Sequence, residues 1–177
     1  MSRVIFAVLL GLLLAGCASE APLLIRQAPP QPVSVAAVRQ DPGRYQGRIV
    51  RWGGTIAGVE NRHSETWVEI VDRPLWGDGR PREGDASDGR FVARVHGFLD
   101  PAIYEKGRAM TFYGKVDGEQ VRPVGQYPYH YPVVDTLSYH LWAKLPPPPR
   151  WPDGYWGPCS LGDPFFPYYP CCPFGCR

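Results

Sequence analysis

Apolar and polar residues alternate along the middle of the chain, which predicts a protein built mainly of β-strands. The alternation is clear over residues 91–96, where Phe91, Ala93 and Val95 share one face of an extended segment. Side chains in a strand point to opposite faces in turn, so this period of two indicates a half-buried strand. Valine, isoleucine and aromatic residues are frequent in these segments, as is typical of strands. The predicted strands cover residues 49–56, 66–71, 91–96, 109–116 and 131–142.

Residues that favour turns and helix ends separate these segments. Gly53 and Gly54 predict a bulge or a tight bend within the first strand. Asp117-Gly118 predicts a hairpin turn after the fourth. Asp100 precedes a proline, an order that suits the start of a short helix or turn between the third and fourth strands.

Ahead of the strands, residues 33–40 are expected to form one or two helical turns with Ser34 as the N-cap. Five short strands with a helical turn between the third and fourth predict a small closed five-stranded antiparallel barrel of OB type, with one short helix. Closure removes exposed sheet edges. An open antiparallel sandwich is the alternative. We assign residues 33–145 to this barrel domain.

The N-terminal segment has the pattern of an export signal. Arg3 precedes an uncharged apolar run over residues 4–15, which is shorter than the ~20 residues that a membrane-spanning helix needs. The run ends in Leu14-Ala15-Gly16-Cys17, which resembles a bacterial lipobox. The resemblance implies removal of residues 1–16 as a signal peptide, and attachment of diacylglycerol to the sulfur of Cys17 and of a fatty acyl chain, such as palmitate, to its amine. A plain secretory signal is the alternative.

Two proline-rich segments flank the predicted barrel. Residues 17–32 contain four prolines and no hydrophobic period, which predicts a lipidated flexible tether. Residues 146–177 begin with four consecutive prolines and interleave aromatic residues with proline, so we expect an irregular tail. This tail holds the remaining cysteines, which are candidates for disulfides: Cys159, Cys171, Cys172 and Cys176.

Composition and motifs narrow the possible functions. The net charge of +2 and the lack of a basic block argue against nucleic acid as a partner. No Gly-x-Ser-x-Gly sequence is present, and the Asp78, Asp85 and Asp88 loop lacks the spacing of an EF-hand. We therefore predict no catalytic, cofactor-binding or metal-binding residues. The histidines lack zinc-type spacing and are expected to be solvated or at strand edges: His63, His96, His130 and His140.

Several short sequences together resemble one bacterial family. They occur in order at residues 47–56 (GRIVRWGGTI), 71–75 (VDRPL), 79–81 (GRP), 89–93 (GRFVA), 97–101 (GFLDP), 104–108 (YEKGR), 129–134 (YHYPVV) and 140–142 (HLW). In this order, and with the lipobox, the chain resembles the Slp family of outer-membrane lipoproteins, which is named for a starvation-inducible member. The match covers about residues 33–145 and leaves the cysteine-rich tail outside it.

The resemblance implies a lipoprotein anchored through Cys17 in the bacterial outer membrane, facing the periplasm, with no established enzymatic activity. Ala18, in place of the aspartate that often retains such lipoproteins in the inner membrane, favours this address. We expect a non-enzymatic structural, interaction or stress-related role in the envelope. The partners would be the lipid bilayer, through the acyl anchor, and an envelope protein, for which the aromatic tail is the expected contact surface. The alternative is a periplasmic ligand-binding, redox or metal-binding module that uses the tail cysteines.

Overall fold

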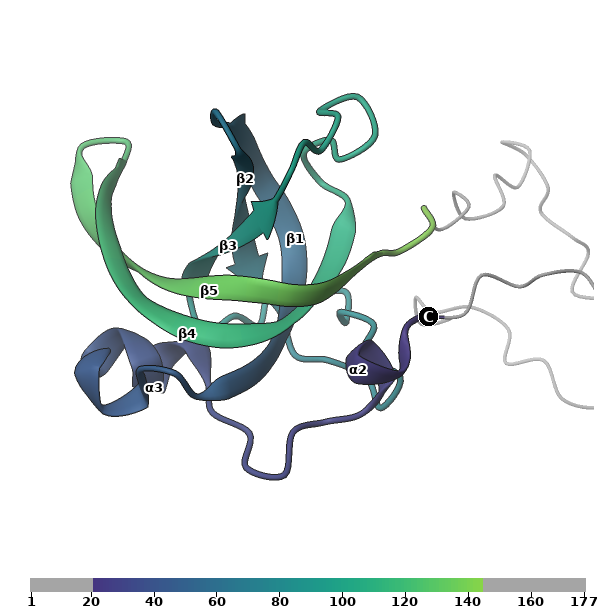
Figure 1. The fold of residues 1–177 in the computed structure, drawn as a ribbon, viewed down its shortest axis with the longest axis horizontal. Coiled ribbons are helices and arrows are strands. Elements are labelled where there is room, and N and C mark those ends of the chain that lie inside the picture. Colours follow the sequence, from purple (N-terminus) through teal and green to yellow (C-terminus); the bar gives the residue numbers. More distant parts are fainter. Residues whose placement is uncertain (1–20, 145–177) are drawn as a thin grey trace, which may run out of the picture. The chain divides into compact units, whose positions relative to one another are not determined.

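The structure, a computed structural model, describes residues 21–144 and is mainly β (Figure 1). Three short helical segments come first and five strands follow, two of them long and strongly curved. None of the helices in this part of the chain is long and apolar enough to cross a bilayer. The elements are α2 (Leu23–Arg26), α3 (Val35–Gln40), the 3-10 turn η1 (Gly43–Tyr45), β1 (Ile49–Asn61), β2 (Glu65–Asp72), β3 (Arg90–His96), β4 (Ala109–Val124) and β5 (Tyr127–Leu141).

The strands close into a ring in the order β1–β2–β3–β5–β4, with β4 paired again to β1. This closure excludes the open sandwich. The prediction of an entirely antiparallel arrangement is wrong at one position, because β3 and β5 pair in parallel over residues 92–94 and 133–135. The reason is topological: around a closed ring with an odd number of strands, direction cannot alternate at every step. One parallel neighbour is the minimum, and the ring has one.

Alternate residues of every strand fill the interior of the ring. The predicted inward residues Phe91, Ala93 and Val95 of β3 are all buried. The ring of Phe91 contacts Trp52 of β1 and Phe112 of β4 edge to face, with centroids 5.3 and 6.1 Å apart. These aromatic contacts join three strands across the core, and edge-to-face geometry is the arrangement that aromatic pairs prefer.

The paired glycines of β1 lie where the strand changes partners. β1 pairs with β4 over residues 49–55 and with β2 over residues 54–61. A Cβ atom on Gly54 would lie 1.9 Å from the carbonyl oxygen of Val71, so only glycine allows the two backbones this approach. The paired glycines thus allow a close approach of backbones, and the bulge in the β1–β2 pair lies further along, between Ile56 and Gly58.

Asp117-Gly118 does not form the predicted hairpin turn. β4 continues through it to Val124, and the β4–β5 register shifts between Val116 and Glu119. Gly118 has a φ of +80°, which supports a bulge as well as a turn. The chain reverses instead after Val124, so β4 and β5 extend as a long ribbon. We call residues 117–132 the arm.

β5 also contains a bulge, which reverses the inward face of the strand. Tyr113 of β4 pairs with Ser138, but the next residue, Gly114, pairs with Thr136, so Leu137 is extra. Leu137 is consequently exposed, although it lies an even number of residues from the buried Val133 and strict alternation would place both on the same face. A bulge shifts the parity of all residues after it.

The helices differ in part from the prediction. α3 begins where expected, because the Ser34 hydroxyl accepts a hydrogen bond from the Ala37 amide at 3.2 Å. Val35 and Val38 of α3 join the ring's core. No helix lies between β3 and β4; the Asp100 carboxylate accepts from the Ala102 amide at 2.9 Å and stabilises only a turn. Of the short helix or turn predicted there, the structure has the turn, and the short helices of the described residues lie ahead of β1 instead.

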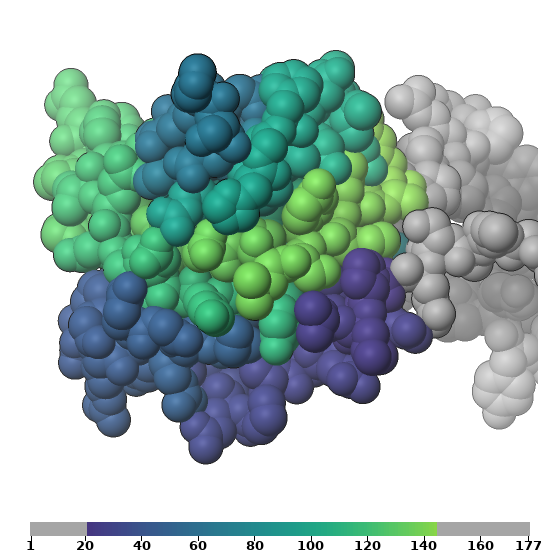
Figure 2. Space-filling view, viewed as in Figure 1, coloured from purple at the N-terminus to yellow at the C-terminus, as the bar shows by residue number. Residues whose placement is uncertain are grey.

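Residues 21–32, which the prediction assigned to a flexible tether, include the helix α2 and contact the ring. Ile25 of α2 is fully buried, and it packs with Ala21 and Trp142. In the space-filling view the purple N-terminal segment lies directly against the yellow-green end of β5 (Figure 2). Burial of one isoleucine and its backbone contacts fixes a segment whose composition resembles a linker.

Candidate functional site

The outer side of β2 and β3 carries a connected set of charged and aromatic side chains. On β2, Thr66, Val68 and Ile70 are fully buried, so the residues between them point outward. The outward residues are Glu65, Trp67 and Glu69 of β2 and Arg94 of β3. We call the surface that they form with their partners on the arm the outer polar face.

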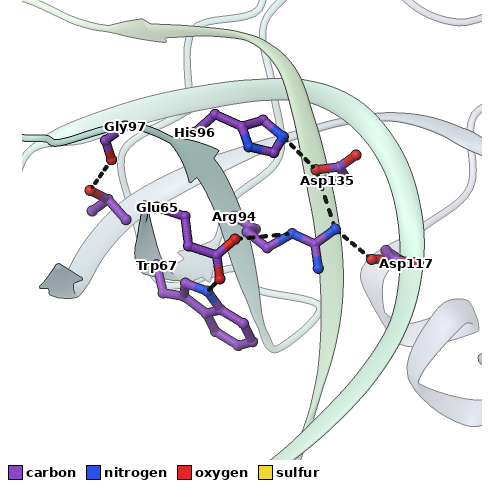
Figure 3. Close-up of polar contacts among 8 residues, drawn as sticks. Glu65, Trp67, Arg94, His96, Gly97, Asp117 and Asp135 are labelled. Atoms are coloured by element: carbon purple, nitrogen blue, oxygen red, sulfur yellow. Dashed lines mark hydrogen bonds and ion pairs between the residues drawn. The ribbon is translucent and has the colours of Figure 1, made fainter. Parts of the chain in front are cut away.

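Arg94 is the centre of this face (Figure 3). Its Nη2 donates to Asp117 Oδ2 at 2.6 Å and lies 3.3 Å from Asp135 Oδ1, while its Nε lies 3.7 Å from Glu65 Oε2. Burial lowers the pKa of Arg94, but the interactions with Asp117 and Asp135 together outweigh it and raise the pKa overall. His96 Nε2 lies 3.4 Å from Asp135 Oδ1. One guanidinium thus joins β2, β3, the start of the arm and β5.

Trp67 lies between two arginines. The Arg62 guanidinium is 3.7 Å from the centroid of its ring, and that of Arg122, from the arm, is 5.3 Å away. Both arginines also pair with Glu60. The Trp67 Nε1 donates to Glu65 Oε1 at 2.5 Å, which connects the stacked arginines to the Arg94 cluster. A tryptophan ring faced by guanidinium groups is a favourable cation–π arrangement.

A third group of contacts ties the arm to β2, β3 and α3. Glu69 Oε1 accepts from Arg90 Nη1 at 2.6 Å and from the Tyr131 hydroxyl at 2.9 Å. Burial, followed by the interaction with Glu69, raises the pKa of Tyr131 to about 12. The Tyr129 hydroxyl accepts from the Arg90 amide at 2.8 Å and from the Arg39 side chain. The arm is therefore held to the ring by ion pairs and hydrogen bonds along its length.

The side chains of this face are suited to binding another molecule through polar and aromatic contacts. Its carboxylates are paired with guanidinium groups, and its tyrosine has a raised pKa, which disfavours loss of the proton. Two buried polar atoms, Arg94 Nε and Asp135 Oδ1, make ion pairs but no hydrogen bond. Most buried polar atoms are hydrogen-bonded, whereas these two interact with their neighbours through charge.

The residues that sequence reasoning singled out have different positions. Cys17, Cys159, Cys171, Cys172 and Cys176 lie outside the described residues. His63 is exposed in the turn between β1 and β2, and His130 pairs with Glu119 at 3.0 Å on the arm. Burial, and secondarily the charge of Arg80, lowers the pKa of His140. Within residues 21–144, no group of three histidine, cysteine or acidic side chains is placed to hold a metal ion.

Sequence reasoning missed the outer polar face. The signal was present: Glu65, Trp67 and Glu69 alternate with the apolar residues of the second strand, and Arg94 alternates with those of the third. This alternation predicts that they point outward. It does not show that the arm packs beside them. The predicted hairpin at Asp117-Gly118 ends the fourth strand at residue 116, so the prediction contained no arm.

Comparison with known proteins identifies the class to which this small, mainly β protein belongs. The model of the outer membrane lipoprotein Slp family matches residues 14–172. The chain therefore belongs to the Slp family of outer membrane lipoproteins. The match is longer than the expected 33–145, because it includes Cys17 and three of the tail cysteines. The prediction that the tail lies outside the family pattern is therefore wrong for residues 146–172.

Two proteins of Escherichia coli K12 are among its relatives. The uncharacterized lipoprotein YeaY is 31% identical over 158 residues, which is 81% of each chain. The outer membrane protein Slp is 34% identical over 135 residues, covering 75% of this chain and 71% of that protein. An uncharacterized protein of Haemophilus influenzae is 31% identical over 97 residues, about half of each chain.

Proposed function

We propose that this protein is a non-enzymatic lipoprotein that is anchored through acyl chains on Cys17 in the outer membrane and binds an envelope protein in the periplasm through the outer polar face. The observation that carries the anchor is the family match, which includes Leu14-Ala15-Gly16-Cys17. The name of the relative Slp, an outer membrane protein, supports the same compartment. Two or three acyl chains would give stable attachment to the bilayer.

The composition and rigidity of the outer polar face support its role in binding. Tryptophan, tyrosine and arginine are the residues most enriched in the energetically important parts of protein interfaces. Here Trp67 is fixed by Arg62, Arg122 and Glu65, so little side-chain entropy remains to be lost when a partner binds.

The arrangement of strands favours the same surface. We interpret the ring, with its β1–β2–β3–β5–β4 order, as an OB-like barrel. Proteins of that fold use the face of strands 2 and 3 and the neighbouring loops for binding. The outer polar face lies on β2 and β3 and is bordered by the arm, which consists of the end of β4, the start of β5 and the reversal that joins them.

The anchor is tested by replacing Cys17 with serine. The intact mass of the membrane-extracted protein should include diacylglycerol and one further acyl chain, and Cys17→Ser should abolish both the added mass and sedimentation with outer membranes. Cys159→Ser is the matched control and should keep both. A Cys17→Ser protein that is processed and sediments as the parent does would contradict the anchor.

The binding surface is tested by cross-linking in living cells. Trp67→Ala should reduce cross-linked envelope partners at least tenfold, because it removes the centre of the stacked group. Leu137→Ala, an exposed position outside the outer polar face, is the control and should leave them unchanged. Equal yields of cross-linked partners from the two variants would show that the partner binds at another surface.

The tail cysteines define the second candidate, a redox or metal-binding module. An even number of cysteines in an oxidising compartment favours disulfides. Thiol titration of the unreduced, acylated protein should therefore find Cys159, Cys171, Cys172 and Cys176 blocked. Reactive thiols or stoichiometric bound metal would instead support the second candidate.

A further inference from the structure

We propose that one face of the ring rests on the lipid surface of the outer membrane. This face consists of Leu23 and Leu24 of α2, Trp76 in the loop after β2, and the arginines beside them, and we call it the N-terminal face. The proposal rests on the proposed acylation of Cys17. It adds an orientation to the anchor, since it states which side of the protein touches the bilayer.

α2 is fixed firmly to the ring. Ile25 is fully buried and packs with Trp142, the residue that follows β5. Arg51 of β1 donates through Nη1 to the carbonyl oxygens of Ile25 and Arg26, both at 3.0 Å. These bonds satisfy carbonyl groups at the C-terminal end of α2, which would otherwise lack partners. The position of α2 is therefore determined by side chains of β1 and of the segment after β5.

The loop that carries Trp76 lies against α2. Trp76 and Arg80 are joined by a backbone hydrogen bond of 2.8 Å across a tight turn that includes Gly79. A Cβ atom on Gly79 would lie 2.3 Å from the carbonyl oxygen of Ile25. The Gly79 carbonyl accepts from the buried Thr111 hydroxyl at 2.7 Å, and that hydroxyl accepts from Trp142 Nε1 at 2.9 Å. The loop and α2 thus form one surface.

The side chains that this surface presents to solvent are those expected at a membrane interface. Leu23, Leu24 and Trp76 are 57%, 44% and 51% exposed. The Arg82 guanidinium lies 4.2 Å from the centroid of the Trp76 ring, and Arg80 lies over Trp142. Tryptophan is favoured at the headgroup level of bilayers, and leucine inserts below it.

The distance to the anchor brings this face, rather than another, to the bilayer. Residues 17–32 as a free tether would reach about 54 Å, enough for any orientation. Because the chain is packed on the ring from Ala21, only four residue steps separate Cys17 from the ring, which limits the reach to about 14 Å. Leu23 and Leu24 follow within one helical turn of Ala21. Acyl chains in the membrane therefore hold the N-terminal face beside the lipid.

The charged residues of the loop in this face are balanced in number, and α2 adds the single cation Arg26. Arg80 and Arg82 are accompanied by Asp78 and Glu83 in the same loop. The contact should therefore depend mainly on the apolar side chains and change little with salt, in contrast to a polybasic membrane site.

The test uses the acylated full-length protein in vesicles of phosphatidylethanolamine and phosphatidylglycerol, with and without brominated acyl chains. Bromine quenches nearby tryptophan, and the Trp76 signal is the difference between the parent and Trp76→Phe. We expect at least half of that difference signal to be quenched, and L23E/L24E to abolish the quenching. Val121→Glu, an equally exposed apolar position on the arm, is the matched control and should leave it unchanged.

Two results would overturn the proposal. One is a Trp76 difference signal that bromine does not quench while water-soluble iodide does, which would show a face directed to solvent. The other is a signal protected from both, which would show that another part of the chain, such as residues 145–177, covers this face. The intact mass of the same sample reports acylation separately. Missing acyl chains would therefore refute the anchor, whereas an acylated protein with unquenched Trp76 would refute only the orientation.

Discussion

Replacement of Asp72 by asparagine should change how the stability of the protein depends on pH. Asp72 is the last residue of β2 and is only 9% exposed. Burial raises the pKa of its carboxyl group to about 7, from an ordinary 3.8. A hydrogen bond from the Asp88 backbone and the charge of Arg73 lower the pKa, the Asp88 carboxylate raises it, and burial is the largest of these effects. The folded protein therefore binds this proton more tightly than the unfolded chain does.

The sign and size of the effect follow from that difference. A raised pKa in the folded state stabilises the fold fully below pH 3.8, and this contribution is lost as the pH rises through about 7. The interval is about 3.2 pH units, and each unit corresponds to about 1.36 kcal/mol, so the total is about 4 kcal/mol. Asp72→Asn removes the titrating group. The free energy of unfolding of the variant, relative to the parent, should rise by up to about 4 kcal/mol between pH 4 and pH 8.

Urea unfolding at pH 4, 5, 6, 7 and 8 measures this difference, with both proteins in a Cys17→Ser background to avoid the anchor. Asp88→Asn provides a second comparison: it removes a carboxylate that raises the pKa of Asp72, so the pH dependence should become smaller but not disappear. A constant difference between Asp72→Asn and the parent across this range would refute the reasoning, because it would show that the carboxyl group titrates alike in the folded and unfolded states.

Two further changes test the arm and the ring. Arg94→Met leaves three carboxylates facing one another and should lower the free energy of unfolding by about 1–2 kcal/mol, since the cluster is partly solvated. In urea unfolding, R94M/D117N should recover part of that loss. If Arg94→Met loses no stability, apolar contacts alone hold the arm. Gly54→Ala places a methyl group 1.9 Å from the Val71 carbonyl oxygen and should cost more than about 3 kcal/mol, measured as the thermal midpoint or yield of folded protein. Gly58→Ala, with no atom within 4 Å of the added Cβ, is its control and should be nearly neutral, so equal effects from the two alanines would contradict the close approach.

Much of the strand content was predictable from the chain alone. Phe91, Ala93 and Val95 point inward as their alternation predicts, because alternation is a property of neighbouring residues in an extended chain. Ser34 begins α3 for an equally local reason, since its hydroxyl reaches the amide three residues later. The lipobox around Cys17 is likewise read from adjacent residues, and it led to the family that the comparison confirms.

Partners distant in the sequence decided the remaining features. Asp117-Gly118 has the local chemistry of a turn, but a glycine with positive φ also fits a bulge, and pairing of residues 119–124 with β5 selects the bulge. The parallel β3–β5 pair exists only because the ring closes with five strands.

The outer polar face and the N-terminal face have the same origin. Arg94 meets Asp117 and Asp135 only after the arm is in place, and Ile25 is buried only because Trp142 reaches it from the other end of the described chain. The sequence by itself determined the central parts of the strands, the helix start and the lipobox pattern, which depend on residues a few positions apart. The tertiary structure alone decided which surfaces exist, because long-range contacts depend on ring closure and not on local pattern.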